Sequence, residues 1–322
     1  MAVGSGSSLQ AGKESTWGTA VASTFPINFT SESIVLKADK KADESLLASK
    51  AAMASDLMRL SVDGSFSFVL RPEFAGQLFK MALGGTDIVS QNVGAVTGYH
   101  KHSIVLADAN GAFPSYTFIV DRKVAVKKYA GGKVESLSLE CKAGDYVKGT
   151  VNIKAKDETS GSLTAGLNFS KKSFKTIGAT LVVGGVTHDV NNAIFTLANN
   201  LQESEQTYGL GLYNPEPLHS TRDITIDFDI PYSTAIDTLK DTYLLTNDLA
   251  NTAVLTLLSP SMVTGTSPYK VVLTLNNVSV TDVSYNVSST GVISAKVSAK
   301  ALAIGSTEPL TAEIYDDTSA AY

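Results

Sequence analysis

The sequence predicts a mainly β protein made of two tandem, similar β-sandwich or barrel domains, each with one flanking α-helix. Three observations lead to this prediction: strictly alternating apolar residues, an abrupt change to helical spacing, and the recurrence of both later in the chain. The first domain, with an N-terminal arm, is expected to span residues 1–158. The second, with a C-terminal arm, is expected to span 159–322.

The stretch SVDGSFSFVLRPEFAGQLFKMAL, residues 61–83, changes its hydrophobic period halfway. Its first part alternates apolar and polar residues, which is the pattern of a strand with one buried face. The apolar positions are Val62, Phe66, Phe68 and Leu70. After Pro72 the apolar residues follow helical spacing, and they are Phe74, Leu78, Met81 and Ala82. The pattern predicts a strand that leads directly into a short amphipathic helix, ended by Gly84 and Gly85.

The segment TRDITIDFDIPYSTAIDTLKDTYLL, residues 221–245, repeats this arrangement. At an offset of 160, Phe66 and Phe68 correspond to Ile226 and Phe228. Downstream the offset falls to 146, which aligns Val134 with Val280, Val151 with Val297 and Lys154 with Lys300. Loops of different length would produce such a drift. The repeated order and polarity predict an internal duplication.

Each copy also contains further short strands, separated by turn signals, and one long polar connection. The long connections span residues 37–60 and 198–220. The first is charged at its start and rich in Ala, Met and Leu later. A segment of this kind either projects from a sheet or folds as a helical arm.

Composition excludes several classes of function. No apolar run approaches the roughly 20 residues that span a bilayer, and the start lacks a secretion-signal pattern, so synthesis in a cytoplasm is expected. A net charge of −5 argues against a protein that grips nucleic acid phosphates. Residues 1–158 carry a net charge of +2 and residues 159–322 one of −7, so the two halves can attract each other.

Catalytic and metal-binding chemistry has little support in the sequence. No phosphate-binding loop, nucleophile elbow or zinc-protease motif is present. His100 and His102 would share a strand face, but a metal needs three or four ligands. Cys141, the single cysteine, is expected to be a buried apolar residue. We therefore expect no enzyme, no cofactor and no metal.

Two predicted strands carry polar faces opposite their buried faces. The residues on these faces are Asp63, Ser65 and Ser67 in the first copy and Asp223, Thr225, Asp227 and Asp229 in the second. Aspartate, serine and threonine offer DNA phosphates nothing to bind and repel them weakly. Such a face suits the wall of a conduit for DNA.

Three segments resemble one protein family. They are GKESTWGTAV (residues 12–21), GYHKHSIVLADANGAFPSYTFIVD (98–121) and the helix after SFSFVLRPEF. They are similar to segments of the tail tube proteins, or major tail proteins, of tailed bacteriophages. The resemblance covers most of the chain and is sharpest in the first half. It implies two sheets with a flanking helix, in subunits that form stacked rings around a lumen carrying DNA and the tape-measure protein.

Single-domain members of the family form hexameric rings, so a duplicated chain would be expected to form a trimeric ring with pseudo-sixfold symmetry. The expected partners are other copies of the chain, the tape-measure protein, and the tail terminator and distal tail proteins. DNA would pass without specific binding, and no membrane would be involved. The expected location is the virion tail, after synthesis in the host cytoplasm. The second copy has only SPYK where the first has PSYT, which leaves open a tube domain joined to a differently used appendage.

The resemblance also suggests roles for particular residues. The polar strand residues named above would line the lumen. The long connections would contact neighbouring rings, with candidate residues Lys40, Lys41, Asp43, Glu44, Glu203 and Glu205. The arms at both chain ends could cross to neighbouring subunits.

Two other functions fit the sequence less well. The first is a β-sandwich binding module of a tail, baseplate or surface structure that recognises carbohydrate. Only Trp17 and scattered tyrosines are available to stack on sugars. The second is a hydrolase that uses Asp227 or Asp229.

Overall fold

The computed structural model describes residues 4–43, 54–108, 111, 113–164, 166, 169–203, 211–246, 248–285 and 293–322. The fold is mainly β, as the alternating sequence pattern predicts. In strands such as Asp223–Pro231 and His100–Leu106, one set of alternate side chains is buried and the other is accessible.

Helices are few in the described part of the chain. They are α1 (Pro72–Leu83), α2 (Thr234–Leu239) with the π-helical turn η3 (Lys240–Leu244), and the 3₁₀ turns η1 (Gly4–Gly6) and η2 (Val93–Ala95). The two α-helices lie where the change of period predicts them. Pro72 begins α1 because its fixed φ suits a first helical turn, and Gly84 ends it at φ 78°.

The strands of the first half are β1 (Ser8–Lys13), β2 (Phe25–Ile27), β3 (Phe29–Glu32), β4 (Val35–Ala42), β5 (Ser55–Val69), β6 (Gly84–Ser90), β7 (His100–Leu106), β8 (Tyr116–Asp121), β9 (Val126–Lys142), β10 (Lys148–Ala155) and β11 (Asp157–Ser160). Those of the second half are β12 (Lys175–Val183), β13 (Val186–His188), β14 (Asn192–Ala198), β15 (Asp223–Pro231), β16 (Ala250–Thr264), β17 (Ser267–Tyr285), β18 (Ser294–Ala301) and β19 (Leu310–Asp316).

One layer of the fold is a continuous antiparallel sheet that includes strands of both halves. Its order is β4, β5, β10, β9, β14, β15, β18, β17. The halves meet where β9 pairs with β14, from Asn192 opposite Lys142 to Ala198 opposite Ser136. We call this layer the shared sheet.

The opposing layer contains two groups of strands. In the first, β2, β1, β8, β9 and β11 are neighbours in that order. In the second, the order is β6, β7, β19, β17, β16, β12, β13. The long strands β9 and β17 thus belong to both layers. Each contains a residue with positive φ between its two parts, Gly131 (74°) in β9 and Asn277 (50°) in β17.

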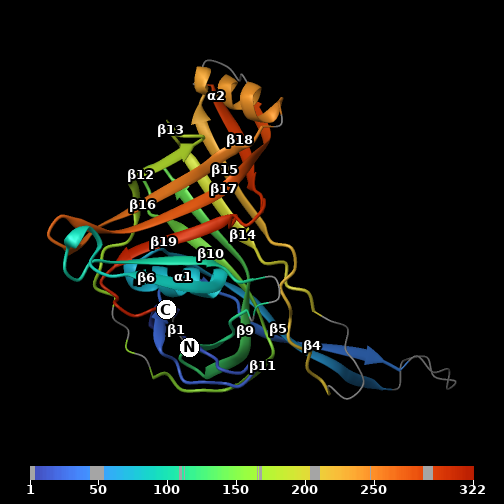
Figure 1. The fold of residues 1–322 in the computed structure, drawn as a ribbon. Coiled ribbons are helices and arrows are strands. Elements are labelled where there is room, and N and C mark those ends of the chain that lie inside the picture. The colour runs from blue at the N-terminus through green and yellow to red at the C-terminus, as the bar shows by residue number, and fades with distance from the viewer. Residues whose placement is uncertain are drawn as a thin grey trace.

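The long connection after β3 forms a β-hairpin, so the helical-arm alternative is wrong for its described part. β4 and β5 pair from Val35 opposite Asp63 to Ala42 opposite Ser55. Figure 1 shows this hairpin extending away from the body of the molecule. The second long connection lies against its base, where the Leu60 N–H donates to the Leu212 carbonyl at 2.8 Å.

Both chain ends contain strands that pair within their own chain among the described residues. β1 pairs with β8, and β19 pairs with β7 and β17. The N-terminal segment is held by Glu14, whose side chain is buried. Its carboxylate accepts hydrogen bonds from the Ser115 and Thr117 hydroxyls (2.8 and 2.7 Å) and from the Gly131 and Gly18 N–H groups (2.8 and 3.0 Å). The segment that carries the sequence resemblance therefore has a structural role.

Replacing Glu14 by Ala should lower the free energy of unfolding by about 3 kcal/mol, because three buried donors and the partly buried Gly18 N–H lose their acceptor. Urea unfolding of the unassembled chain, followed by circular dichroism, measures this. The control is Glu158→Ala, which removes a partly exposed ion pair with Lys127 and should cost at most about 1 kcal/mol. Equal losses in the two variants would contradict the anchoring role of Glu14.

Candidate functional site: the polar face of the shared sheet

The seven polar strand residues singled out from the sequence lie on one face of the shared sheet. Asp63, Ser65 and Ser67 are on β5, and Asp223, Thr225, Asp227 and Asp229 are on β15. All seven are partly accessible, whereas the intervening apolar residues are buried. β10, β9 and β14 lie between β5 and β15, and β4 and β18 flank them, so the face is wider than these two strands.

β10, β9, β14 and β18 add further polar side chains to the same face. Across the strands, Ser67, Thr150, Ser138, Thr196 and Thr225 are successive register partners. The Ser67 and Thr150 hydroxyls lie 3.0 Å apart. Sequence reasoning missed the residues on these strands, although the same alternation of polar and apolar residues marks them. We call the whole surface the polar face.

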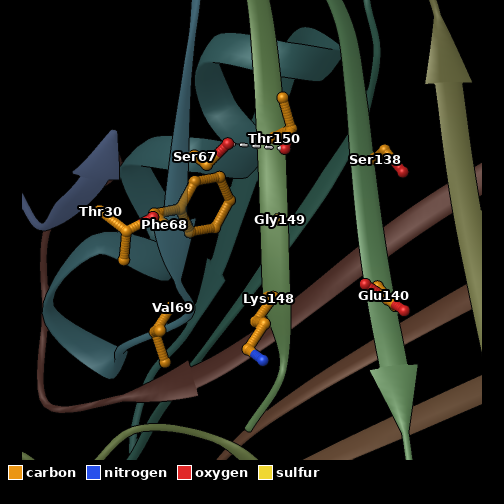
Figure 2. Close-up of a pocket in the computed structure, with 9 residues that line it drawn as sticks. All are labelled: Thr30, Ser67, Phe68, Val69, Ser138, Glu140, Lys148, Gly149 and Thr150. Carbon is orange, nitrogen blue, oxygen red and sulfur yellow. Dashed lines mark hydrogen bonds between the residues drawn. The ribbon is translucent and has the colours of Figure 1, made fainter. Parts of the chain in front are cut away.

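A shallow groove of about 410 Å³ lies on the polar face between β5, β10 and β9 (Figure 2). Its polar lining residues include Thr30, Ser67, Ser138, Glu140, Lys148 and Thr150. The groove contains no histidine or cysteine, and Glu140 and Lys148 are register partners on adjacent strands. The lining is that of a hydrated sheet surface, without a nucleophile and base placed together.

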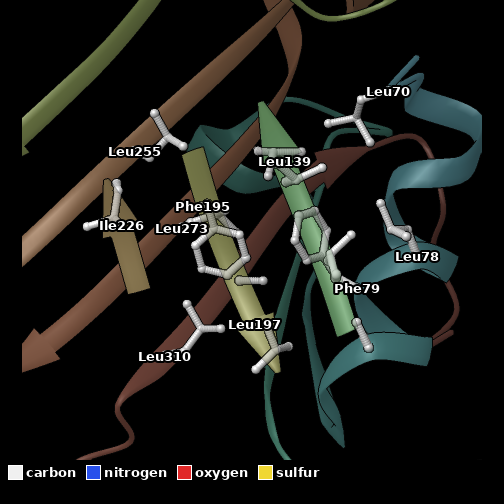
Figure 3. Close-up of a cluster of buried hydrophobic side chains, with 14 of the residues drawn as sticks. Leu70, Leu78, Phe79, Leu139, Phe195, Leu197, Ile226, Leu255, Leu273 and Leu310 are labelled. Carbon is white, nitrogen blue, oxygen red and sulfur yellow. The ribbon is translucent and has the colours of Figure 1, made fainter. Parts of the chain in front are cut away.

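The opposite face of the same strands forms the hydrophobic core. Figure 3 shows Leu139 of β9, Phe195 and Leu197 of β14 and Ile226 of β15 together with side chains of α1. These four residues are at most 2% exposed, and the buried cluster includes residues of both halves. Core packing therefore fixes which side chains point to the polar face.

Lysines stand among the aspartates, so the polar face is of mixed charge rather than uniformly acidic. Lys300 donates a charged hydrogen bond to Asp223, and Lys37 lies 3.2 Å from Asp63. Hydrogen bonds from Lys300 and Asn200 lower the pKa of Asp223, which keeps its carboxylate ionised. Asp227 accepts a hydrogen bond of 2.5 Å from the Ser298 hydroxyl.

The candidate ring-contact residues have different surroundings. Lys40 and Lys41 are exposed on β4, and Asp43 follows that strand. Glu203 instead lies in a cluster at the hairpin base, where it pairs with Arg59 and Lys154 and accepts a hydrogen bond from Asn214. Glu44 and Glu205 lie outside the described residues. Glu203 therefore supports the hairpin within its own chain.

His102, one of the two candidate metal ligands, is fully buried between carboxylates. Its Nδ1 lies 2.9 Å from Asp87, and its Nε2 lies 2.9 Å from the Thr318 carbonyl and 3.3 Å from Asp316. Burial lowers the pKa of His102, but the hydrogen bonds to Asp316 and Asp87 outweigh it and raise the pKa to about 10. The protonated ring holds the end of β19 against β6 and β7.

Two further features bear on metal binding and nucleophilic chemistry: the clustering of possible ligands and the single thiol. Across the described ranges, no group of three or more His, Cys, Asp or Glu side chains is placed to hold a metal ion. Cys141 is buried, and burial raises the pKa of its thiol to about 12. A thiol with such a pKa is not a nucleophile at neutral pH.

Residues 4–314 match the family model of the phage tail tube protein. The chain belongs to this family. The match covers nearly the whole chain, so it includes both the shared sheet and the opposing layer. No curated protein matches the chain significantly. In the part of the chain described, no helix is both long and apolar enough to cross a membrane.

Family membership establishes the general role of this tail tube protein. It is a structural component of the virion tail that assembles with copies of itself into a tube. Proteins of this kind are generally not enzymes.

The His102 cluster predicts a pH dependence of stability. The pKa of His102 is about 10 in the folded chain and is expected near 6.5 once unfolded, so the folded chain retains a proton that the unfolded chain loses between these values. The stabilisation is complete below pH 6.5 and disappears as the pH rises to about 10. The unfolding free energy of the wild type minus that of His102→Asn should therefore shrink above pH 7, by at most about 1.4 kcal/mol per pH unit. Urea unfolding at several pH values measures it.

The control is His219→Asn. Burial and nearby cations lower the pKa of His219, so its replacement should leave the decline above pH 7 intact. A wild-type advantage over His102→Asn that stays constant up to pH 10 would contradict a charged His102.

Proposed function

We propose that this protein forms trimeric, pseudo-hexameric rings that stack into a tail tube, and that its polar face lines the lumen through which DNA leaves the virion. The observation that carries the proposal is the shared sheet, with one dry face, one polar face and an edge strand at each end. Joining such sheets edge to edge would give a closed barrel with the polar face inward.

The recurrence of strand pairings supports an internal duplication with repeat units 1–158 and 159–322. β1–β8, β4–β5, β5–β10, β8–β9, β9–β10 and β9–β11 have counterparts in β12–β16, β14–β15, β15–β18, β16–β17, β17–β18 and β17–β19. Gly131 and Asn277, both at positive φ, are 146 residues apart, which is the downstream offset found in the sequence. In the structure the two helices start at Pro72 and Thr234, which are 162 residues apart rather than the 160 found by comparing the sequence segments.

The two units do not form separate bodies, because they share a sheet and a buried cluster. The β9–β14 junction is a contact between unlike units within a chain. Three chains would contribute six similar units in alternation, and the opposite net charges of the halves would favour contacts between unlike neighbours.

The polar face suits the passage of DNA. Its hydroxyls stay hydrated. Its lysines lie beside carboxylates, and these carboxylates compete with DNA phosphates for the lysine ammonium groups. DNA would therefore move without specific binding, and the tape-measure protein would occupy the same lumen before ejection. The tail terminator and distal tail proteins would bind the two ends of the tube. Synthesis would take place in the host cytoplasm.

The hairpin β4–β5 is the best-placed element for contacts between rings. It extends away from the body, and Lys40 and Lys41 are exposed along it (Figure 1). The carbohydrate-binding alternative has no supporting observation. The Trp17 indole donates to the Gly131 carbonyl and has the Lys156 ammonium 5.1 Å from its ring centre, so it is engaged within the chain.

Electron microscopy of the purified protein tests the proposed assembly. End-on class averages should display hollow rings with six similar lobes, made of three chains. Particles that remain single in every buffer, even with a tape-measure partner added, would contradict the proposed function. Rings with another number of lobes would contradict the trimer alone.

Replacing Asp227 and Asp229 by Lys should leave tube formation intact but hinder DNA passage. The added cations would bind phosphates, so tubes of the variant should bind DNA in a salt-dependent manner that wild-type tubes lack. Phage carrying the variant should eject DNA more slowly and give fewer plaques. The matched control is Asp121→Lys with Asp248→Lys, two positions outside the shared sheet. Normal plaque numbers from the first variant would remove the polar face from the lumen.

A further inference from the structure

We propose that chains in a ring join by pairing β4 of one copy with residues 279–285 of β17 in the next copy, in the register with which β14 pairs with β9 inside each chain. The partner at this edge is a second copy of the same chain. The inference rests on the proposed function and specifies the contact that would close the ring.

The junction inside the chain provides the template. Along one side of β9, the first half of the strand pairs with β8, up to Gly132 opposite Tyr116. Beyond that point β14 takes the same side, with Leu197 opposite Leu137 and Ala198 opposite Ser136. The other side of β9 is occupied by β11 and then β10.

β17 has the same surroundings with one strand missing. Val278 pairs with both Ala250 of β16 and Ala301 of β18, so these two strands lie on opposite sides of β17. The register of β16 ends at that pair, while β18 continues to Tyr285. Among the described residues, no strand pairs with residues 279–285 on the β16 side. That vacant edge corresponds to the edge of β9 that β14 occupies.

β4 corresponds to β14 and has the matching vacant edge. Within the described ranges it pairs with β5 alone. The preceding residue, Ile34, is closed to pairing because its N–H donates to Glu32 and its carbonyl accepts from Arg122, at 3.1 and 2.6 Å. These two side chains also pair with each other. Strand addition can therefore begin only after Ile34, which limits the possible registers.

Two structural markers fix the register. In β4, Leu36 pairs with Val62, and in β14 Leu197 pairs with Ile224, so Leu36 and Lys37 correspond to Leu197 and Ala198. β9 has a bulge between Val134 and Ser136, and β17 has one between Val280 and Asp282. Ser136 and Leu137 therefore correspond to Asp282 and Val283.

Transferred to the edge between copies, this register places Leu36 opposite Val283 and Lys37 opposite Asp282. The first pair continues the apolar face of the sheet, and the second joins opposite charges on the polar face. Asp282 has no ion pair with any described residue, and the Lys37 side chain remains 57% exposed beside Asp63. The contact is head-to-tail, so repeated rotation can close a ring.

The geometry permits a covalent test. The Ser33 N–H donates to the Ser65 carbonyl, so odd-numbered residues here direct their backbone groups towards β5. Lys37 and Asp282 would then form a non-hydrogen-bonded pair, with Cα atoms about 4.5 Å apart, within the range for a disulfide.

Assembled tubes of Lys37→Cys/Asp282→Cys should become covalent multimers up to closed trimers when oxidised, as seen on non-reducing gels. The control is Lys37→Cys/Ser279→Cys, with the second cysteine on the same strand but out of register, and it should remain monomeric. Cys141 is buried and present in both variants. Equal cross-linking of the two variants, or hollow tubes with no cross-link in the first, would overturn the proposed register.

A charge exchange keeps the inference testable if the cysteine variant does not assemble. Lys37→Asp and Asp282→Lys should each raise the protein concentration needed for tube formation about two- to fivefold, and the double exchange should restore it. Additive losses in the double variant would overturn the Lys37–Asp282 pair. If the wild type forms tubes but the variants contradict the register, the proposed function remains intact. If the wild type forms no tubes, both the proposed function and the proposed register are overturned.

Discussion

The pairing of β9 with β14 is the contact on which the rest of this structure depends. It joins the two halves of the chain into one sheet, with Leu137 opposite Leu197 on the buried side and Ser138 opposite Thr196 on the polar side. Because a shift of one residue would exchange these sides, the core fixes the register of the junction. The polar face exists as one surface only because this register holds across both halves. A junction of similar strands also shows how further copies can be joined without a new kind of contact.

The two long strands determine how the layers are connected. β9 and β17 each pass from the opposing layer into the shared sheet, and each has a residue with positive φ between its two parts. Glycine adopts this conformation without strain, and asparagine is the residue that tolerates it best among those with side chains. The buried Glu14 carboxylate, which belongs to the N-terminal segment, accepts hydrogen bonds from the Gly131 N–H and the Ser115 hydroxyl. The bend and the anchoring of the N-terminal segment are therefore parts of one arrangement.

Charge has two different roles in the molecule. Some buried charges, such as protonated His102 between Asp87 and Asp316, are paired with opposite charges and hold segments in place. Accessible charges on the polar face are arranged as neighbouring lysines and aspartates, which limits the attraction of the face for phosphates. At the hairpin base the partly exposed Glu203 also holds segments together, because it links Arg59 with Lys154. Rigidity thus comes from charges paired inside the subunit, whereas the polar face carries a surface that interacts weakly with phosphates.

The sequence by itself determined the mainly β class, the positions of α1 and α2, and the buried side of alternating strands such as β15. Alternation, the proline at the start of α1 and the glycine at its end are local signals, and local chemistry is sufficient to read them. The tertiary structure decided which strands are neighbours. Ser136–Lys142 and many other strand segments share the same alternation of polar and apolar residues, so this alternation does not specify the neighbouring strand. It also decided that the first long connection is a hairpin, that Glu203 faces its own chain, and that lysines of β18 meet aspartates of β15. These outcomes depend on contacts between residues far apart in the chain, and a single sequence does not record such contacts.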